Sequence, residues 1–309
     1  MQSGKEQVAE QRWLPDVAVP SAPTGLDAEA IARHPRFTAF LRQQASTLVS
    51  IHAVNPRIAS VFATQQRWLI AHLALAHYFR GSGAEGSSGF HVTPFLDAVE
   101  AHGIASRNTA DAFLKEMGHY GYLAKAAAGP DRRLRPLEPT AISLEMICAW
   151  LATHLTTLDG LDDGQRCAAF LAQPQAIAAI QPRIADALMQ SGAIREPGTT
   201  FSLFTWLNEG GIVMDWLYAG LGEIAPDCER IPTHVTSIAD LGSRIRLSRT
   251  HLTRKLRLAE SLGSLGWLGK RGKSTLWVSA GFVAEYHAQQ SVKLAIIGDA
   301  FHAVLGQRR

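Results

Sequence analysis

The sequence predicts a mainly helical protein that contains small β-hairpins, and three observations support this prediction. Apolar residues recur near the helical period of about 3.6 in most segments, as Trp68, Leu75 and Phe79 do within 64–80. Short apolar segments flank turns rich in glycine, proline and charge, which is typical of hairpins. The same order of expected elements also occurs twice, which predicts two copies of one domain rather than a solenoid of short repeats.

The first part of the chain predicts an arm, then helices around one hairpin. Residues 1–26 contain Pro15, Pro20 and Pro23 among small and polar residues, so a flexible arm is expected there. A further break follows at 81–89, which read GSGAEGSSG. The expected elements are helices at 27–53, 64–80, 94–102 and 106–118, two strands around a charged turn within 122–139, and a helix at 140–158.

The second part of the chain repeats this order. A long helix is expected at 201–223, with a kink at Gly210 and Gly211. Two short helices at 235–246 and 248–263, two strands within 265–279 and a closing helix at 280–305 complete the list. The matching landmarks are Val92-Thr93 and Val235-Thr236, Ser106-Arg107 and Ser248-Arg249, and Gly121-Tyr122-Leu123 and Gly266-Trp267-Leu268. The expected organisation is an arm at 1–26 and two domains at 27–160 and 161–309.

Composition places the chain among ordinary globular proteins, with 47% of its residues apolar and 18% charged. Its three cysteines, Cys148, Cys167 and Cys228, lie far apart without CxxC spacing. This pattern argues against a disulfide framework and favours a reducing compartment, so a cytoplasmic location is expected. The longest apolar run, 68–79, is interrupted by two histidines, and no membrane span is predicted.

Positive charge is concentrated in the segment 244–273. The segment holds nine basic residues and a single acid, Glu260, so its net charge is +8, whereas the whole chain carries only +3. A basic cluster that coincides with a helix and a hairpin is typical of a nucleic-acid-binding surface. The simpler interpretation is a solvated basic face.

Within this segment, residues 248–261 predict a helix with one buried and one basic face. Ser248 is expected to be the N-cap, with its hydroxyl accepting a backbone N–H. Leu252, Leu256 and Ala259 fall on one stripe, which indicates the buried side. Arginine and threonine side chains on the other face suit the major groove of DNA. That exposed face is expected to consist of Thr250, Thr253, Arg254 and Arg257.

The neighbouring segments favour the same interpretation. The preceding helix has Gly242 at the point where two helices joined by a short turn would cross closely. Downstream, the sequence GKRGK at 269–273 places three cations at the tip of a hairpin. Such a tip can contact the phosphate backbone or the minor groove.

These segments resemble a known family. The sequence at 241–279 resembles a winged helix-turn-helix, and the sequence at 103–136 is similar to MarR-type transcriptional regulators of bacteria. In that family a wing containing DRR follows the recognition helix and a strand, as Asp131-Arg132-Arg133 does here. The resemblance implies that Arg132 or Arg133 contacts the minor groove.

The resemblance covers about 85–158 and 233–305, and it implies two winged helix-turn-helix domains joined and framed by long helices. The chain departs from the family at Arg246, where the turn usually has glycine. Family members are also usually single-copy dimers of half this length. One chain with two copies resembles an internally fused dimer, so a monomeric pseudo-dimer or a homodimer is expected.

The expected function is that of a double-stranded DNA-binding transcriptional regulator, with the 248–261 helix in the major groove and the basic wings on the backbone or minor groove. The candidate DNA-binding residues are Arg244, Arg246, Ser248, Arg249, Thr250, His251, Thr253, Arg254, Lys255, Arg257, Lys270, Arg271, Lys273, Ser106, Arg107, Asn108, Lys115, Arg132, Arg133 and Arg135.

Two alternatives stay open at this point. The helix at 106–118 has charges that sum to zero, so the first copy is either a second DNA-contacting domain or a degenerate one kept for packing. The second alternative is a protein-interaction module whose cations bind an acidic partner.

Catalytic and metal chemistry have little support in the sequence. The twelve histidines show no HExxH or comparable spacing, and the chain lacks Walker, GxSxG and βαβ-linked GxGxxG motifs. No enzyme activity, metal or cofactor is therefore predicted. The family resemblance implies a crevice for a small-molecule effector, although core packing is the simpler interpretation of each aromatic residue. The candidate effector-pocket residues are Trp68, His72, Trp206, Trp216 and Tyr218.

Overall fold

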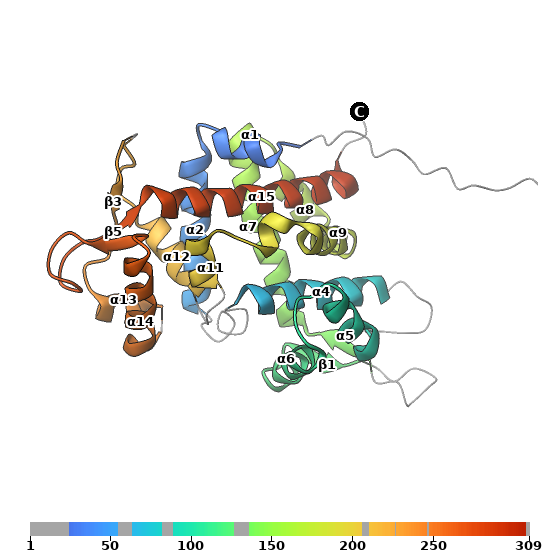
Figure 1. Ribbon diagram of the computed structural model, residues 1–309. Helices are drawn as coiled ribbons and strands as arrows, with labels where there is room; N and C mark the ends of the chain where they lie inside the picture. Colours follow the sequence, from blue (N-terminus) through green and yellow to red (C-terminus); the bar gives the residue numbers. More distant parts are fainter. Residues whose placement is uncertain are drawn as a thin grey trace, which may run out of the picture.

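The protein is mainly helical with two small antiparallel sheets (Figure 1), as the sequence predicts. The computed structural model describes residues 25–54, 64–81, 89–126, 136–205, 210–225, 227–245 and 247–306. Residues 1–24 of the expected arm lie outside this part of the chain.

The first half of the chain begins with two helices where the sequence predicts one. α1 (Ala28–Arg33) ends before His34, whose backbone is extended, and α2 (Phe37–Val54) starts three residues later. The break follows from Pro35, because proline disfavours the helical conformation in the residue before it. The remaining elements agree with the prediction and are α4 (Gln65–Gly81), α5 (Val92–Ala101), α6 (Arg107–His119), β1 (Leu123–Lys125), β2 (Leu137–Pro139) and α7 (Ala141–Asp162).

The second half starts with elements that the sequence does not predict, and the amphipathic α9 is the longest of them. Within the helix expected at 201–223 the structure describes α11 and α12, and residues 206–209 between them lie outside the described part of the chain, so the kink at Gly210 and Gly211 stays a prediction. The elements are α8 (Arg166–Ala172), η1 (Pro174–Ala176), α9 (Ile177–Gln190), α10 (Gly192–Arg195), α11 (Thr199–Thr205), α12 (Gly210–Ala219), β3 (Arg230–Pro232), α13 (Ile238–Arg244), α14 (Arg249–Ser261), β4 (Leu265–Trp267), β5 (Leu276–Ser279) and α15 (Ala280–Leu305).

Each sheet is a short antiparallel hairpin with an additional partner. β1 pairs with β2, and the bridge between Phe90 and Leu137 extends this pair on its other edge. In the second half, β5 lies between β4 and β3, so this sheet has the order β3-β5-β4. The sequence does not predict β3, which is short and ends at Pro232.

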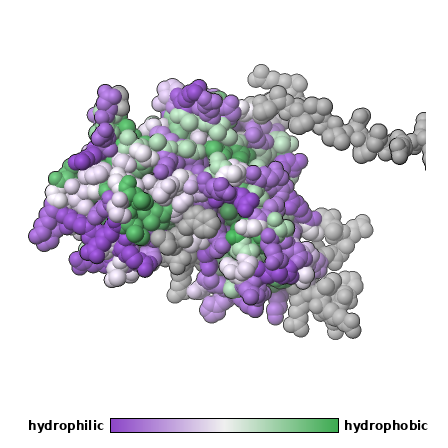
Figure 2. Space-filling view, viewed as in Figure 1, coloured by the Kyte–Doolittle hydropathy of each residue, from purple (hydrophilic) through white to green (hydrophobic). Residues whose placement is uncertain are grey.

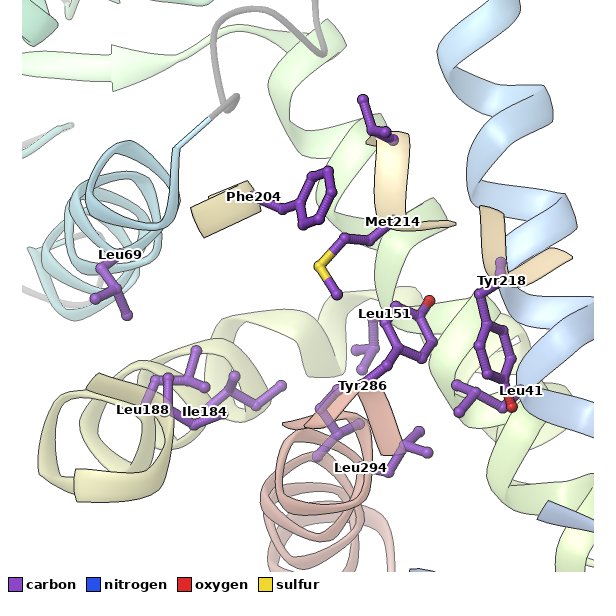
Figure 3. Packing of buried hydrophobic residues seen from close by; sticks show 14 of the residues in the cluster. Leu41, Leu69, Leu151, Ile184, Leu188, Phe204, Met214, Tyr218, Tyr286 and Leu294 are labelled. Atoms are coloured by element: carbon purple, nitrogen blue, oxygen red, sulfur yellow. The ribbon is translucent and has the colours of Figure 1, made fainter. Parts of the chain in front are cut away.

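The core lies where the long helices of both halves meet. α2 packs against α7 and α12, and α9 packs against α15 and α4, so each of these two helices contacts both halves of the chain. Figure 3 shows Leu151 of α7, Met214 of α12 and Tyr286 of α15 directed toward one another at this junction. All three side chains are buried. The halves therefore share one continuous hydrophobic core.

α7 is the one helix in the described part of the chain that is long and apolar enough to cross a membrane, with a mean hydropathy of 1.3. In this fold, Leu151, Leu155 and Leu161 have no exposed surface, and the helix packs against α2, α8 and α15. These contacts bury 33% of its apolar window.

Candidate nucleic-acid interface

A tight turn positions α14 against α13. The Ser248 hydroxyl caps α14 by accepting a hydrogen bond from the backbone N–H of His251 (3.2 Å). The Leu247 N–H donates to the Gly242 carbonyl (2.9 Å) and closes the turn. A Cβ at Gly242 would lie 3.1 Å from the carbonyl oxygen of Leu247, so glycine permits the close approach that the sequence predicts.

α14 buries the stripe that the sequence predicts. Leu252, Leu256 and Ala259 have no exposed surface, and their packing fixes which face of the helix points outward. Thr253 and His251 are half-buried at the edges of that face. The exposed residues along the helix include Arg249, Thr250, Arg254 and Arg257.

Lys255 is not on the exposed face, and its prediction as a DNA-binding residue is wrong. Its side chain has no exposed surface, and its ammonium group donates to the Phe204 carbonyl of α11 (3.3 Å). Lys255 lies three residues after Leu252 and next to Leu256, so the helical period places it on the buried stripe. The helical period predicts a buried position for Lys255, whereas its charge alone suggests an exposed one.

The exposed cations around α14 differ in whether they already have an acidic partner. Arg244 is paired with Asp240 (2.9 Å), and Arg271 is paired with Glu260 (2.9 Å). For the others, no carboxylate of the described residues lies within 4.0 Å of the cationic nitrogens. These unpaired and exposed cations are Arg249, Arg254, Arg257, Lys270 and Lys273.

The hairpin that follows α14 is fixed to the helix by Glu260, the only acid of the basic segment. Its carboxylate accepts hydrogen bonds from Trp267 Nε1 (2.7 Å) and Arg271 Nε (2.9 Å). The tip itself is closed by hydrogen bonds from the Lys273 N–H to the Lys270 carbonyl (3.0 Å). Lys270 and Lys273 are therefore held at the outer end of the hairpin rather than on a loose loop.

Figure 1 places the β4–β5 hairpin at the far left, above α13 and α14. Hydrophilic side chains cover this end of the molecule in Figure 2. α6 lies on the same lower side as α14 in Figure 1, opposite α1. One side of the molecule therefore presents both of the helices that the sequence assigns to DNA contact.

α6 presents far less free charge than α14. Ser106 caps this helix by accepting from the Thr109 N–H (3.3 Å), as Ser248 caps α14. Arg107 forms an ion pair with Asp97, and Lys115 pairs with Asp111 (2.6 Å). Asn108 is exposed and uncharged. The sequence correctly gives the charges of this helix a zero sum, and the structure adds that both of its predicted DNA-binding cations are paired.

Comparisons with protein-family models, with curated proteins and with solved structures found no match for this chain.

Several predicted residues lie outside the described part of the chain. They are the wing arginines Arg132, Arg133 and Arg135, the turn residue Arg246 and the aromatic residue Trp206.

Two of the predicted effector-pocket residues line a cavity. Trp68 and His72 of α4 line a cavity of about 760 Å³, which is open to the surface at exposed residues such as Ile142 and Glu145. Trp216 and Tyr218 do not line it, and their assignment to this pocket is wrong. Tyr218 is fully buried, stacks on Tyr286 with ring centroids 4.4 Å apart, and shares a 2.6 Å hydrogen bond with His287 Nε2. It belongs to the core between α12 and α15.

Two buried histidines, His72 and His154, are held in the neutral form. Burial lowers the pKa of His72 to about 3, and its ring Nδ1 lies 2.9 Å from Gln181 Nε2. Burial also lowers the pKa of His154 well below its usual value. In the described ranges, no group of three or more histidine, cysteine and acidic side chains could hold a metal ion.

Proposed function

We propose that the protein is a double-stranded DNA-binding transcriptional regulator whose principal contact surface is α14 with the β4–β5 hairpin. The observation that carries the proposal is the set of five exposed cations on this surface that no carboxylate of the described residues pairs. Arginine on an exposed helix can bind guanine in the major groove, and lysine on a hairpin tip can bind phosphate.

The proposed domain type is a winged helix-turn-helix. Three features support it: the short turn between α13 and α14, the cap at Ser248, and the hairpin that follows α14 directly. The bond between Glu260 and Arg271 gives helix and hairpin a fixed relative position, as simultaneous contact with one DNA duplex requires.

The proposed architecture is an internal pseudo-dimer of two such domains. Helix, hairpin and long closing helix follow in the same order in α6–β1–β2–α7 and α14–β4–β5–α15. Leu155 and Leu158 of α7 stand at the same distance from the helix start as Leu294 and Ile297 of α15, and all four are buried. The reciprocal packing of α2 on α12 and of α9 on α4 supports the same arrangement.

A matched pair of double variants tests the proposal. Arg249 and Arg257 are the first and ninth residues of α14, and Arg107 and Lys115 are the first and ninth residues of α6. Both double substitutions to alanine remove two positive charges. Binding to a fluorescent random-sequence duplex is measured by anisotropy, and circular dichroism verifies that each variant folds.

We expect the α14 variant to lose at least about tenfold in affinity, because each lost contact to a charged group contributes about 1.5–3 kcal/mol. The α6 variant should retain most of the affinity, since its cations are already paired. Equal losses would refute the assignment of α14 as the principal contact. Failure of the parent protein to bind duplex DNA, together with binding to a polyglutamate chain, would instead identify an acidic protein partner.

A further inference from the structure

The cavity of about 760 Å³ lies at the junction of the two halves, within the size range of sites for small organic ligands. Its wall is mostly apolar and includes aromatic side chains from α4, α6, α7 and α11. Trp68 and Trp150 lie with ring centroids 6.3 Å apart on this wall. Phe113 of α6 and Phe201 of α11 also line it. An apolar ligand would therefore contact several rings at once.

One cationic group, Lys293 of α15, lines this apolar cavity. No carboxylate of the described residues lies within 4.0 Å of its ammonium nitrogen, and Lys293 has no hydrogen-bond partner among them. Burial lowers the pKa of this group to about 8, so the ammonium form still predominates at neutral pH. Lys293 is half-buried, and the charge that acts on it is that of Asp215, whose own pKa is raised by burial. An ammonium group in these apolar surroundings favours an occupant that brings a full negative charge.

The single acid in the interior of the cavity is less able to receive a cation. Asp215 of α12 accepts a short hydrogen bond from the Tyr286 hydroxyl (2.6 Å). Burial raises the pKa of Asp215, which favours its neutral form. The other carboxylate on the wall, Glu145, is exposed. The unsatisfied polar group of the cavity is therefore a donor rather than an acceptor.

We propose that this cavity binds one amphipathic organic anion per chain, with its acid group at Lys293 and its apolar body among the rings of α4, α6, α7 and α11. Suitable ligands are aromatic carboxylates or sulfonates of the size of two or three fused or linked rings. The proposal concerns ligand binding alone and does not depend on whether the protein binds DNA.

The expected stoichiometry of one follows from the second half of the chain. Phe113 is the seventh residue of α6, and the seventh residue of α14 is Lys255. Lys255 is fully buried there and bonds to the Phe204 carbonyl, while the Phe204 ring packs edge-on against Phe282 with centroids 6.0 Å apart. The position that matches Phe113 in the second half therefore lies in the packed core, and we infer that the second half offers no second site.

The test compares two fluorescent probes with nearly the same rings. 8-Anilinonaphthalene-1-sulfonate carries a sulfonate, and N-phenyl-1-naphthylamine is its uncharged counterpart. Each is titrated into the parent protein without DNA, and the stoichiometry of the sulfonate is measured by calorimetry. We expect one sulfonate per chain, bound more tightly than the uncharged probe.

Three substitutions locate the site. Lys293→Met keeps the length of the side chain but removes its charge, and should weaken sulfonate binding by at least about tenfold while changing binding of the uncharged probe little. Lys125→Met removes the same charge from an exposed position outside the cavity wall and the α14 surface, and should change neither. A Cβ added at Gly211, on the cavity wall, meets no atom within 4 Å, so Gly211→Leu should fit and block both probes.

The outcomes separate cleanly. Equal affinities for the two probes, or sulfonate binding that Lys293→Met leaves unchanged, would overturn the anion site. Probe binding that survives Gly211→Leu would show that the dyes bind elsewhere and would also overturn it. Gly211→Leu keeps the test decisive if Lys293→Met fails to fold. DNA binding measured on the same samples is a separate result, so failure of either proposal leaves the other standing.

Discussion

The salt dependence of DNA binding offers the sharpest test of which cations contact phosphate. Each phosphate contact that displaces a counterion contributes about −0.9 to the slope of log K against log salt. If all five unpaired cations of the α14 surface contact phosphate, the slope is about −4.5, and it is about −3.6 if Arg254 contacts a base instead. A slope of about −8 would require all nine basic residues of 244–273, including the buried Lys255 and the paired Arg244 and Arg271.

Single substitutions distinguish these cases. Lys270→Ala or Lys273→Ala should each make the slope shallower by about 0.9. Arg271→Ala should change it much less, because Glu260 already neutralises that guanidinium group. Affinity is measured by anisotropy from about 50 to about 200 mM potassium chloride. A slope near zero would refute DNA binding, and equal effects of Arg271→Ala and Lys270→Ala would refute the argument from ion pairing.

Three further predictions follow from individual contacts. Arg254→Ala should weaken the free energy of DNA binding by about 1–3 kcal/mol and relax the preference at one base position in a competition series of site variants. An equal loss of affinity for all site variants would contradict major-groove contact. Gly266→Ala should lower the free energy of unfolding by about 1–3 kcal/mol in urea, because its Cβ would overlap the Trp277 ring, and an unchanged midpoint would contradict this. The unfolded chain protonates His72 below pH about 6.5, whereas the folded protein keeps it neutral down to pH about 3. The free energy of unfolding should therefore fall by about 2 kcal/mol from this group between pH 6.5 and about 5. His72→Asn should reduce that fall, and a fall of the same size in the variant would refute the assignment to His72.

Local signals predict most of the α14 surface. Ser248, the stripe Leu252–Leu256–Ala259 and the exposed arginines follow from capping and from the helical period, because both depend on residues within a few positions of one another. Lys255 is misplaced because its charge receives more weight than its position on that stripe. The same local signals predict the start of α15 after the second hairpin.

The cavity could not be predicted in the same way. Its wall combines residues from α4, α7 and α15, which lie far apart in the sequence, and only the packing of the halves brings them together. The ion pair of Arg107 with Asp97 joins the consecutive helices α5 and α6, and it depends on the angle between them rather than on the period of either helix. The short β3 has a weak local pattern, and tertiary contacts determine it. α9 differs, because it is amphipathic and its helical period is a local signal that could have predicted it.

The reciprocal packing of α2 on α12 and of α9 on α4 lies within a single polypeptide, and this has a consequence for how the protein can diversify. In an assembly of identical chains, a substitution that suits one subunit is imposed on the other as well. Here the seventh residue of α6 is Phe113 and that of α14 is Lys255, so one codon can change without altering its counterpart. A substitution in one half can therefore be selected without a matching change in the other half.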